Sequence, residues 1–189
     1  LAEYAKMAEA YGADVIYFAD SSGYMSPVDI RDRVNAIKSL VKVPIGVHTH
    51  NNLGLGVGNA IAGVEAGATY LDGTLEGLGA GSGNGNMQAI VAVLNRMGIK
   101  TNADVYELME LGKNYVRPII KHSLEITNES ILLGYIGIYS SFYLDVMEAS
   151  KKFNISPKLI FEELGRRKVV GGQEDQILDI CYKILENKL

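Results

Sequence analysis

The 189-residue chain has little of several residue types that mark particular classes of protein. Its single cysteine, Cys181, excludes a disulfide framework and a cysteine-rich zinc site, and suits a reducing cytoplasm. No apolar run approaches the roughly 20 residues of a membrane span, and the first residues do not form a signal peptide. Basic residues number 18 against 22 acidic ones, so the chain lacks the positive surplus that a nucleic-acid binder needs. We expect a cytoplasmic protein that binds neither membranes nor nucleic acid.

What the chain does contain, 48% apolar and 21% charged residues, is ordinary for a globular protein and excludes a disordered one. The first hundred residues repeat one arrangement three times, an apolar β-rich run followed by a helix-like stretch. The runs hold few polar residues before their last positions, which predicts parallel strands buried on both faces and an α/β fold. The runs lie at 15–20, 45–50 and 70–75, and the helix-like stretches at 27–40, 55–66 and 87–97.

The number of strands is too small for a complete barrel. A (β/α)₈ TIM barrel needs eight strands and roughly 250 residues, whereas three units precede a helical pattern that begins near Thr101. The chain opens with an amphipathic helix and no strand before it, which favours a start partway through a barrel over a small open sheet. We therefore expect the last three βα units of a TIM barrel over residues 1–103, followed by a small all-α domain over residues 104–189.

Aromatic residues mark the predicted helical domain. Residues 134–153 carry apolar side chains at three- and four-residue spacings. If this stretch is one helix, Tyr135, Tyr139 and Tyr143 share a face; core packing is the default interpretation, and a hydroxyl that reaches a substrate is the alternative. Gly165 is predicted to end the next helix.

The most specific local feature is His48-Thr49-His50, at the end of the second predicted strand. Residues i and i+2 of a strand point to the same side, with Cα atoms about 6.5 Å apart, and neutral imidazole is a common metal ligand. Two surface histidines in a loop are the alternative. The strand position favours a metal site, because parallel α/β folds place active sites at these strand ends. Asn51 and Asn52 follow directly and are candidates to orient the histidines or to bind a ligand.

Other polar residues lie on the same predicted rim. Asp20, Ser21 and Ser22 end the first strand and either contact a metal-bound substrate or form a turn that caps the next helix. Asp72, in the third predicted strand, is either a partner of the metal ligands or a buried polar residue held by backbone groups. The glycine-rich segment 77–86 precedes a helix and either binds an anion or packs a tight barrel mouth.

Two pairs of segments resemble known enzymes. Residues 48–57 and 78–84 closely resemble the metal-dependent pyruvate aldolases, which share a TIM-barrel superfamily with the isopropylmalate synthases and hydroxymethylglutaryl-CoA lyase. Residues 134–142 and 165–175 are more specific and are similar to the 4-hydroxy-2-oxovalerate aldolase family, including its helical C-terminal communication domain. The resemblance covers residues 1 to 185.

The resemblance implies a class II retro-aldol cleavage of 4-hydroxy-2-oxovalerate to pyruvate and acetaldehyde. In that family a divalent ion, usually Mn²⁺ but also Co²⁺ or Mg²⁺, is held by histidines matching His48 and His50 and by an aspartate on the first barrel strand. Ser21 matches a residue that helps to hold the pyruvate carboxylate. Tyr139 matches the catalytic tyrosine near the C4 hydroxyl and its methyl group. The helical region is expected to contact an acylating acetaldehyde dehydrogenase, which receives the aldehyde through a tunnel.

One family motif is not matched. The family's first strand carries an Arg-Asp pair and a following histidine, which supply a cation, the third metal ligand and the catalytic base. The resemblance begins near the helix before the sixth strand, so we expect this chain to be the C-terminal portion of an aldolase, inactive alone and a weak metal binder. Self-association, or pairing with the remaining barrel half, is expected because an open sheet edge attracts further strands.

Three alternatives remain open. An acyl-CoA Claisen condensing or cleaving enzyme of the same superfamily would use the same histidines, but would carry its own lid or regulatory domain in place of residues 165–175. A non-catalytic module that docks a dehydrogenase would co-purify with that enzyme and contain no metal. A hydrolytic zinc enzyme is the weakest alternative, because no glutamate stands beside the histidine pair as a general base.

Overall fold

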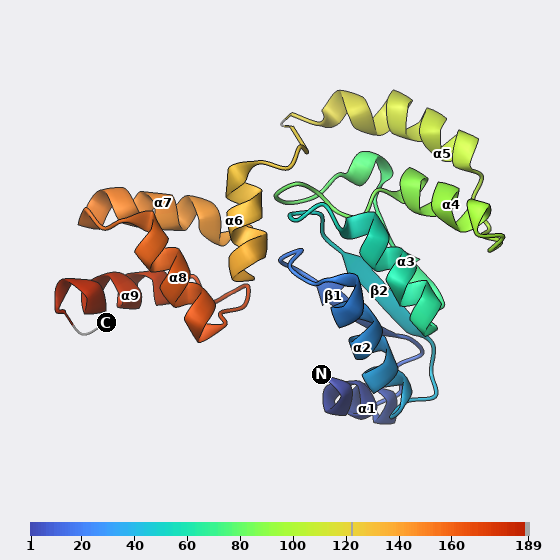
Figure 1. Ribbon diagram of the computed structural model, residues 1–189, viewed down its shortest axis with the longest axis horizontal. Helices are drawn as coiled ribbons and strands as arrows, with labels where there is room; N and C mark the ends of the chain where they lie inside the picture. The colour runs from blue at the N-terminus through green and yellow to red at the C-terminus, as the bar shows by residue number, and fades with distance from the viewer. Residues whose placement is uncertain (122, 188–189) are drawn as a thin grey trace.

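The N-terminal part of the chain is built on a parallel sheet (Figure 1). The computed structural model describes residues 1–121 and 123–187, and within them the strand order is β1-β2-β3. Phe18 pairs with Val47 across the first strand pair, and His48 pairs with Asp72 across the second. The α/β fold with a parallel sheet is therefore confirmed. The elements are β1 (Ile16–Asp20), β2 (Ile45–Thr49), β3 (Tyr70–Asp72), α1 (Ala2–Ala10), α2 (Pro27–Lys38), α3 (Gly56–Ala66) and α4 (Met87–Arg96).

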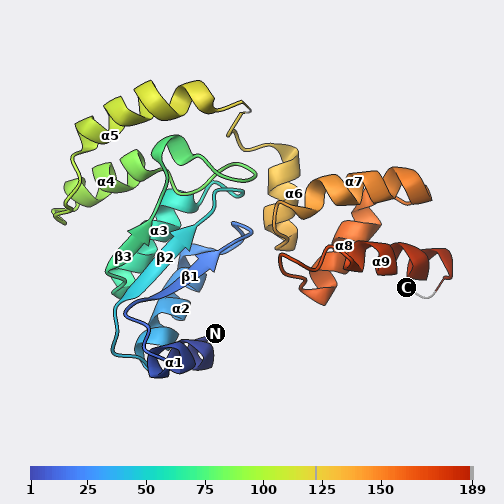
Figure 2. The same cartoon turned by 180° about the vertical axis from the view of Figure 1, so that it is seen from behind.

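Only one face of the sheet is covered by helices in the described chain. Helices α2 and α3 pack behind the strands, and Figure 2 shows the strands from the other side. In β1, buried and exposed residues alternate, so the expectation of strands buried on both faces is wrong for this strand. Tyr17 and Tyr70 lie edge to face on the open side and are 42% and 47% exposed. The covered side packs a core of Ile16, Phe18, Ile30, Val34, Ile37, Ile45, Val47 and Ala62.

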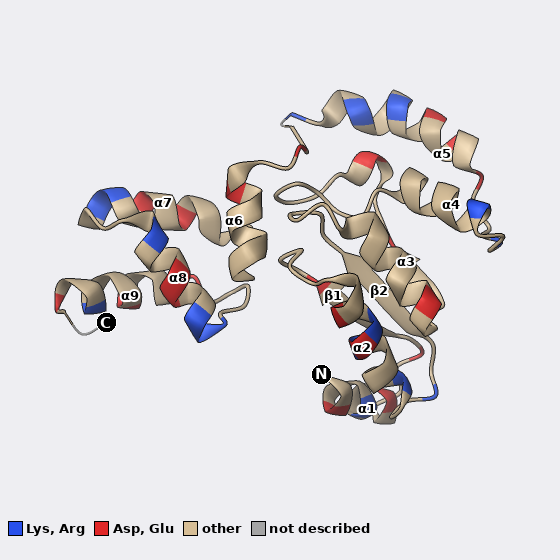
Figure 3. Cartoon of the chain, viewed as in Figure 1, with Lys and Arg blue, Asp and Glu red and all other residues tan. Residues whose placement is uncertain are grey.

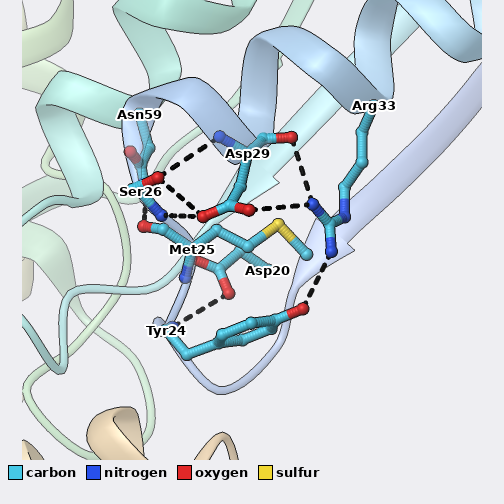
Figure 4. Close-up of polar contacts among 7 residues, drawn as sticks. All are labelled: Asp20, Tyr24, Met25, Ser26, Asp29, Arg33 and Asn59. Carbon is cyan, nitrogen blue, oxygen red and sulfur yellow. Dashed lines mark hydrogen bonds and ion pairs between the residues drawn. The ribbon is translucent and has the colours of Figure 1, made fainter.

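Helix α2 begins at Pro27, where the helix-like stretch was predicted to begin, and a capping box at Ser26 precedes it. The Asp29 backbone N–H donates to Ser26 Oγ at 3.3 Å, and the Ser26 N–H donates to Asp29 Oδ2 at 2.9 Å (Figure 4). Pro27 occupies the first helical turn, where its missing N–H costs nothing. The hydrogen bonds from Ser26 lower the pKa of the Asp29 carboxyl. The capping box therefore fixes the end of the loop between β1 and α2.

Ser26→Ala is expected to lower the free energy of unfolding by about 1 kcal/mol, because it leaves the N–H groups of the first turn of α2 without their side-chain acceptor. Ser39→Ala, at the exposed C-terminal end of the same helix, serves as the control and should change stability by less than about 0.5 kcal/mol. Urea denaturation measures both. Equal effects of the two substitutions would contradict the assigned cap.

A second core lies in the C-terminal part of the chain. Its helices are α6 (Asn128–Ile136), α7 (Phe142–Phe153), α8 (Pro157–Arg167) and α9 (Gln176–Leu185). They enclose an apolar cluster drawn from residues 133–181, and acidic and basic residues are interspersed over the helices of both parts (Figure 3). Between the cores, α5 (Val105–Leu111) packs against α4 and continues into a π-helical turn (Gly112–Val116) and a 3₁₀ turn (Arg117–Ile119). The domain boundary at residue 103 stays a prediction.

In this helical region, the condition for a shared tyrosine face is not met and the predicted helix end at Gly165 is wrong. Residues 134–153 do not form one helix, because Gly137 adopts a left-handed conformation with φ +82° and separates α6 from α7. Tyr139 consequently lies in the connection between these helices and shares no helix face with Tyr135 or Tyr143. Gly165 does not end its helix either, since α8 continues to Arg167.

The lack of a side chain at Gly165 allows close packing. A Cβ atom at this position would collide with the Ile136 side chain of α6, so the glycine allows α8 to pack against α6.

In the part of the chain that the structure describes, no helix combines the length and the apolar character needed to cross a bilayer.

Candidate functional site

The predicted metal ligands and Ser21 lie at the C-terminal ends of β1 and β2, whose loops face α6 (Figure 1). His48 is the last residue of β2 that pairs with β3, and His50 directly follows the last residue of the strand, Thr49. Their ring centroids are 4.9 Å apart and their planes are inclined by 78°. The same-side placement expected from the strand spacing therefore brings the two imidazoles together.

Each imidazole directs its Nδ1 atom toward an oxygen. His50 Nδ1 lies 3.0 Å from the carbonyl oxygen of Asp20, and His48 Nδ1 lies 3.8 Å from Asp72 Oδ2. In a neutral ring that donates through Nδ1, the lone pair remains on Nε2, the atom that binds a metal. Asp72 ends β3 and is exposed, so it is not a buried polar residue; its role as a partner of the metal ligands stays a prediction.

The environment of His50 favours its neutral form. Burial lowers the pKa of this imidazole, and the neighbouring His48 lowers it further, while the hydrogen bond to the Asp20 carbonyl opposes both effects. Within the described residues, no group of three or more His, Cys, Asp or Glu side chains is placed to hold a metal ion. The two histidines fit a divalent ion as part of its ligand set and leave the other positions to further ligands.

The carboxylate of Asp20 organises the loop after β1. It is buried, and it accepts hydrogen bonds from the backbone N–H groups of Tyr24 at 3.1 Å and Met25 at 3.2 Å (Figure 4). Burial raises the pKa of this carboxyl, and the backbone donors counteract the rise. The alternative in which this carboxylate contacts a substrate is therefore not favoured by the geometry. The contribution of Asp20 to the site is its carbonyl oxygen, which the sequence pattern did not indicate.

Ser21 and Tyr139, more than a hundred residues apart in the sequence, line the same cavity of about 550 Å³. Ser22 and Met25 line one side, and the other side comes from the helical part. The Tyr139 ring also meets the His50 ring edge to face, with centroids 6.1 Å apart. Tyr139 thus joins the cavity to the histidine pair. Residues of the helical part that line it are Ile136, Gly137, Tyr139, Gly165, Lys168, Val169, Val170 and Gly171.

In the described residues, the hydrogen bonds of the two asparagines after the histidines go to backbone groups and to Ser140, and not to an imidazole. Asn51 Oδ1 accepts the Gly56 N–H at 3.1 Å, at the start of α3. Asn52 is fully buried and donates to the Ser22 carbonyl at 3.0 Å and to Ser140 Oγ at 3.1 Å. The prediction that these side chains orient the histidines directly finds no hydrogen bond to support it.

The glycine-rich segment packs along the end of β2. The Asn51 N–H donates to the Gly83 carbonyl at 2.8 Å, and the Gly85 N–H donates to the Thr49 carbonyl at 2.8 Å. The Ser82 N–H donates to Asn52 Oδ1 at 3.0 Å. Because these groups already have partners, the geometry favours the packing role over anion binding.

Family models match both parts of the chain. Residues 1–114 match the HMGL-like family and residues 124–186 match the DmpG-like communication domain. The 4-hydroxy-2-oxovalerate aldolase of Moorella thermoacetica is 48% identical over 186 residues, which is 98% of this chain and 55% of that protein. The enzyme of the same name from Carboxydothermus hydrogenoformans is 47% identical over 184 residues, which is 97% of this chain and 55% of that protein. The chain thus spans about half the length of these curated relatives.

A solved structure has the same arrangement of elements. The carboxyl transferase domain of Rhizobium etli pyruvate carboxylase superposes with a TM-score of 0.76 over 100% of this chain and 34% of that one. At 17% sequence identity this likeness concerns the fold alone. The family assignment depends on the sequence matches to both parts and to the curated aldolases. The chain therefore belongs to the HMGL-like family and carries a DmpG-like communication domain in its C-terminal part.

Proposed function

We propose that this chain provides the metal- and pyruvate-binding side of a class II 4-hydroxy-2-oxovalerate aldolase, which cleaves its substrate to pyruvate and acetaldehyde. The observation that carries the proposal is the His48 and His50 pair beside a cavity lined by Ser21 and Tyr139. Relatives 43–48% identical to this chain carry that enzyme name. The three βα units correspond in this proposal to the last three of a TIM barrel.

His48 and His50 would hold a divalent ion, Mn²⁺ in the first instance or else Co²⁺ or Mg²⁺. When bound, such an ion acts as a Lewis acid that stabilises negative charge on the 2-oxo group as the C3–C4 bond breaks. The Ser21 hydroxyl, which lines the cavity, would donate a hydrogen bond to the carboxylate of the pyruvate moiety. The Tyr139 hydroxyl would lie near the C4 hydroxyl of the substrate, and the tyrosine ring would lie near the methyl group.

Further strands and a second enzyme complete the proposal. In the described chain, β1 and β3 each pair along one edge only, and the open sheet face carries Tyr17 and Tyr70. Additional barrel strands, from a second polypeptide or from a longer form of this one, would pair with these edges and cover that face. The communication domain would dock an acylating acetaldehyde dehydrogenase in the cytoplasm and pass the aldehyde to it.

The 189-residue chain alone is expected to show no turnover of 4-hydroxy-2-oxovalerate with added Mn²⁺, because it contains neither the third metal ligand nor the base of the family motif. Pyruvate release, coupled to lactate dehydrogenase, measures this. Turnover at the rate of a full-length relative would contradict the assignment of those roles to residues outside the chain.

A fusion to the N-terminal barrel strands of the Moorella thermoacetica relative tests the activity itself. The fused protein is expected to release pyruvate, and His48→Ala with His50→Ala in the same fusion should abolish the release. A fusion that folds, binds Mn²⁺ and still releases no pyruvate would overturn the proposed activity. Co-purification with a dehydrogenase but no Mn²⁺ binding would instead favour a docking module.

A further inference from the structure

Asn52 lies where three loops meet. Its side chain is fully buried, and both atoms of its amide have partners. The Nδ2 atom donates to the Ser22 carbonyl, in the loop after β1, and to Ser140 Oγ, in the connection between α6 and α7. The Oδ1 atom accepts the N–H of Ser82, in the glycine-rich segment. One amide thus holds two loops of the sheet-containing part and one loop of the helical part.

Two glycines leave room for this amide and its partner. A Cβ atom at Gly81, where φ is +61°, would collide with Asn52 Oδ1 and lie 2.7 Å from Ser140 Oγ. A Cβ atom at Gly134 of α6 would lie 2.7 Å from Leu53 Cγ and 3.3 Å from Asn52 Cβ. Glycine at both positions lets the helical part approach closely enough for the hydrogen bond between Asn52 and Ser140.

The bond to Ser140 determines where Tyr139 lies. Tyr139 is adjacent in sequence to Ser140, belongs to no helix, and places its ring edge to face with His50 at 6.1 Å. On one side of this connection Ile138 is buried in the helical core. In the part of the chain that the structure describes, the connection between α6 and α7 is joined to the loop after β2 by the hydrogen bond from Asn52 to Ser140.

We propose that Asn52 is a positioning residue, which holds Ser140 and thereby keeps Tyr139 against His50 and at the wall of the cavity. The consequence for catalysis rests on the proposed function, whereas the position of the Tyr139 ring does not. Among the described residues, the hydrogen bonds of the Asn52 side chain go to Ser22, Ser82 and Ser140 and not to the histidines. Its effect on the reaction should therefore pass through the tyrosine and leave metal binding unchanged.

The first experiment observes the ring itself. The chain is labelled with 3-fluorotyrosine, and the ¹⁹F resonance of Tyr139 is assigned as the one lost in Tyr139→Phe. Ser140→Ala is expected to shift this resonance, and Ser140→Thr, which keeps a hydroxyl, to restore it. Ser141→Ala is the matched control, because the Ser141 hydroxyl donates to Glu174 Oε1 at 3.2 Å and not to Asn52.

Asn52→Ala gives a second, independent comparison. It is expected to shift the Tyr139 resonance in the same direction as Ser140→Ala. Adding Ser140→Ala to it should produce no further shift, because Asn52→Ala already removes the bond to Ser140 along with its two other hydrogen bonds. An unchanged resonance in Ser140→Ala, or additive shifts in the double variant, would overturn the proposal. If Asn52→Ala does not fold, the Ser140 variants alone decide it.

The second experiment uses the active fusion described above. Ser140→Ala is expected to lower kcat by about 10- to 100-fold, the order of loss that follows a small misplacement of a catalytic group. The affinity for Mn²⁺ should stay unchanged and Ser140→Thr should restore kcat. A shifted Tyr139 resonance without any loss of kcat in Ser140→Ala would overturn the catalytic consequence. An inactive parent fusion would overturn the proposed function, while the ¹⁹F result on the position of the ring would stand.

Discussion

Phe142→Ala is expected to lower the free energy of unfolding of the helical part by about 3–5 kcal/mol, the usual cost of removing a buried aromatic ring. Phe142 is the first residue of α7, is completely buried, and belongs to the apolar cluster formed by α6 to α9. Removing the ring leaves a cavity, and the core residues that packed against the ring lose those contacts. An effect of this size is a large fraction of the stability of a small domain.

Leu144 provides the matched control, since it lies on the same helix and is 75% exposed. Leu144→Ala should change stability by less than about 0.5 kcal/mol. Hydrogen exchange resolved by residue separates the two cores, and faster exchange in Phe142→Ala is expected in α6 to α9 but not in α2 or α3. Equal destabilisation of both cores would show that they unfold as one unit.

Replacing His48 and His50 together with alanine is expected to weaken Mn²⁺ binding at least tenfold. Losing a residue that merely orients a metal ligand already costs about 10- to 100-fold in affinity, and here two proposed ligands are removed. Neither ring is part of an apolar core, and the open face beside His48 leaves room for the change. The fold should therefore survive the substitution.

Electron paramagnetic resonance of free Mn²⁺ during titration measures this affinity. Tyr70→Phe is the control, because it alters the same open face without touching either histidine and should leave the affinity unchanged. Equal Mn²⁺ affinity of the double variant and the unchanged chain would place the metal elsewhere. Circular dichroism establishes that the variants remain folded during the comparison.

Local patterns in the sequence predicted the strands, the start of α2 and the pairing of the two histidines, because each of these depends on neighbours within a few residues. The exposed face of β1 was not predicted, since burial depends on what covers a strand and not on its composition. The helical break at Gly137 was missed because apolar spacing continues across it, whereas a left-handed glycine ends a helix regardless of the flanking pattern.

The arrangement around Asn52 could not be derived from spacing at all. Its partner Ser140 is 88 residues away in the sequence, and the pattern of either segment shows no sign of the other. The same holds for the Asp20 carbonyl that fixes His50, because a backbone acceptor has no residue type to recognise. The metal-binding pair was therefore predictable, while the contacts that set its surroundings were not.

The long separation of Asn52 and Ser140 also has a consequence for the order of folding. Each core forms from segments close in sequence, whereas their junction requires closure of a loop of almost half the chain, which carries a larger entropic cost. The histidine pair should consequently be in place early, and the tyrosine should reach it last. During synthesis, the completed site would then exist only after the helices beyond Ser140 have left the ribosome.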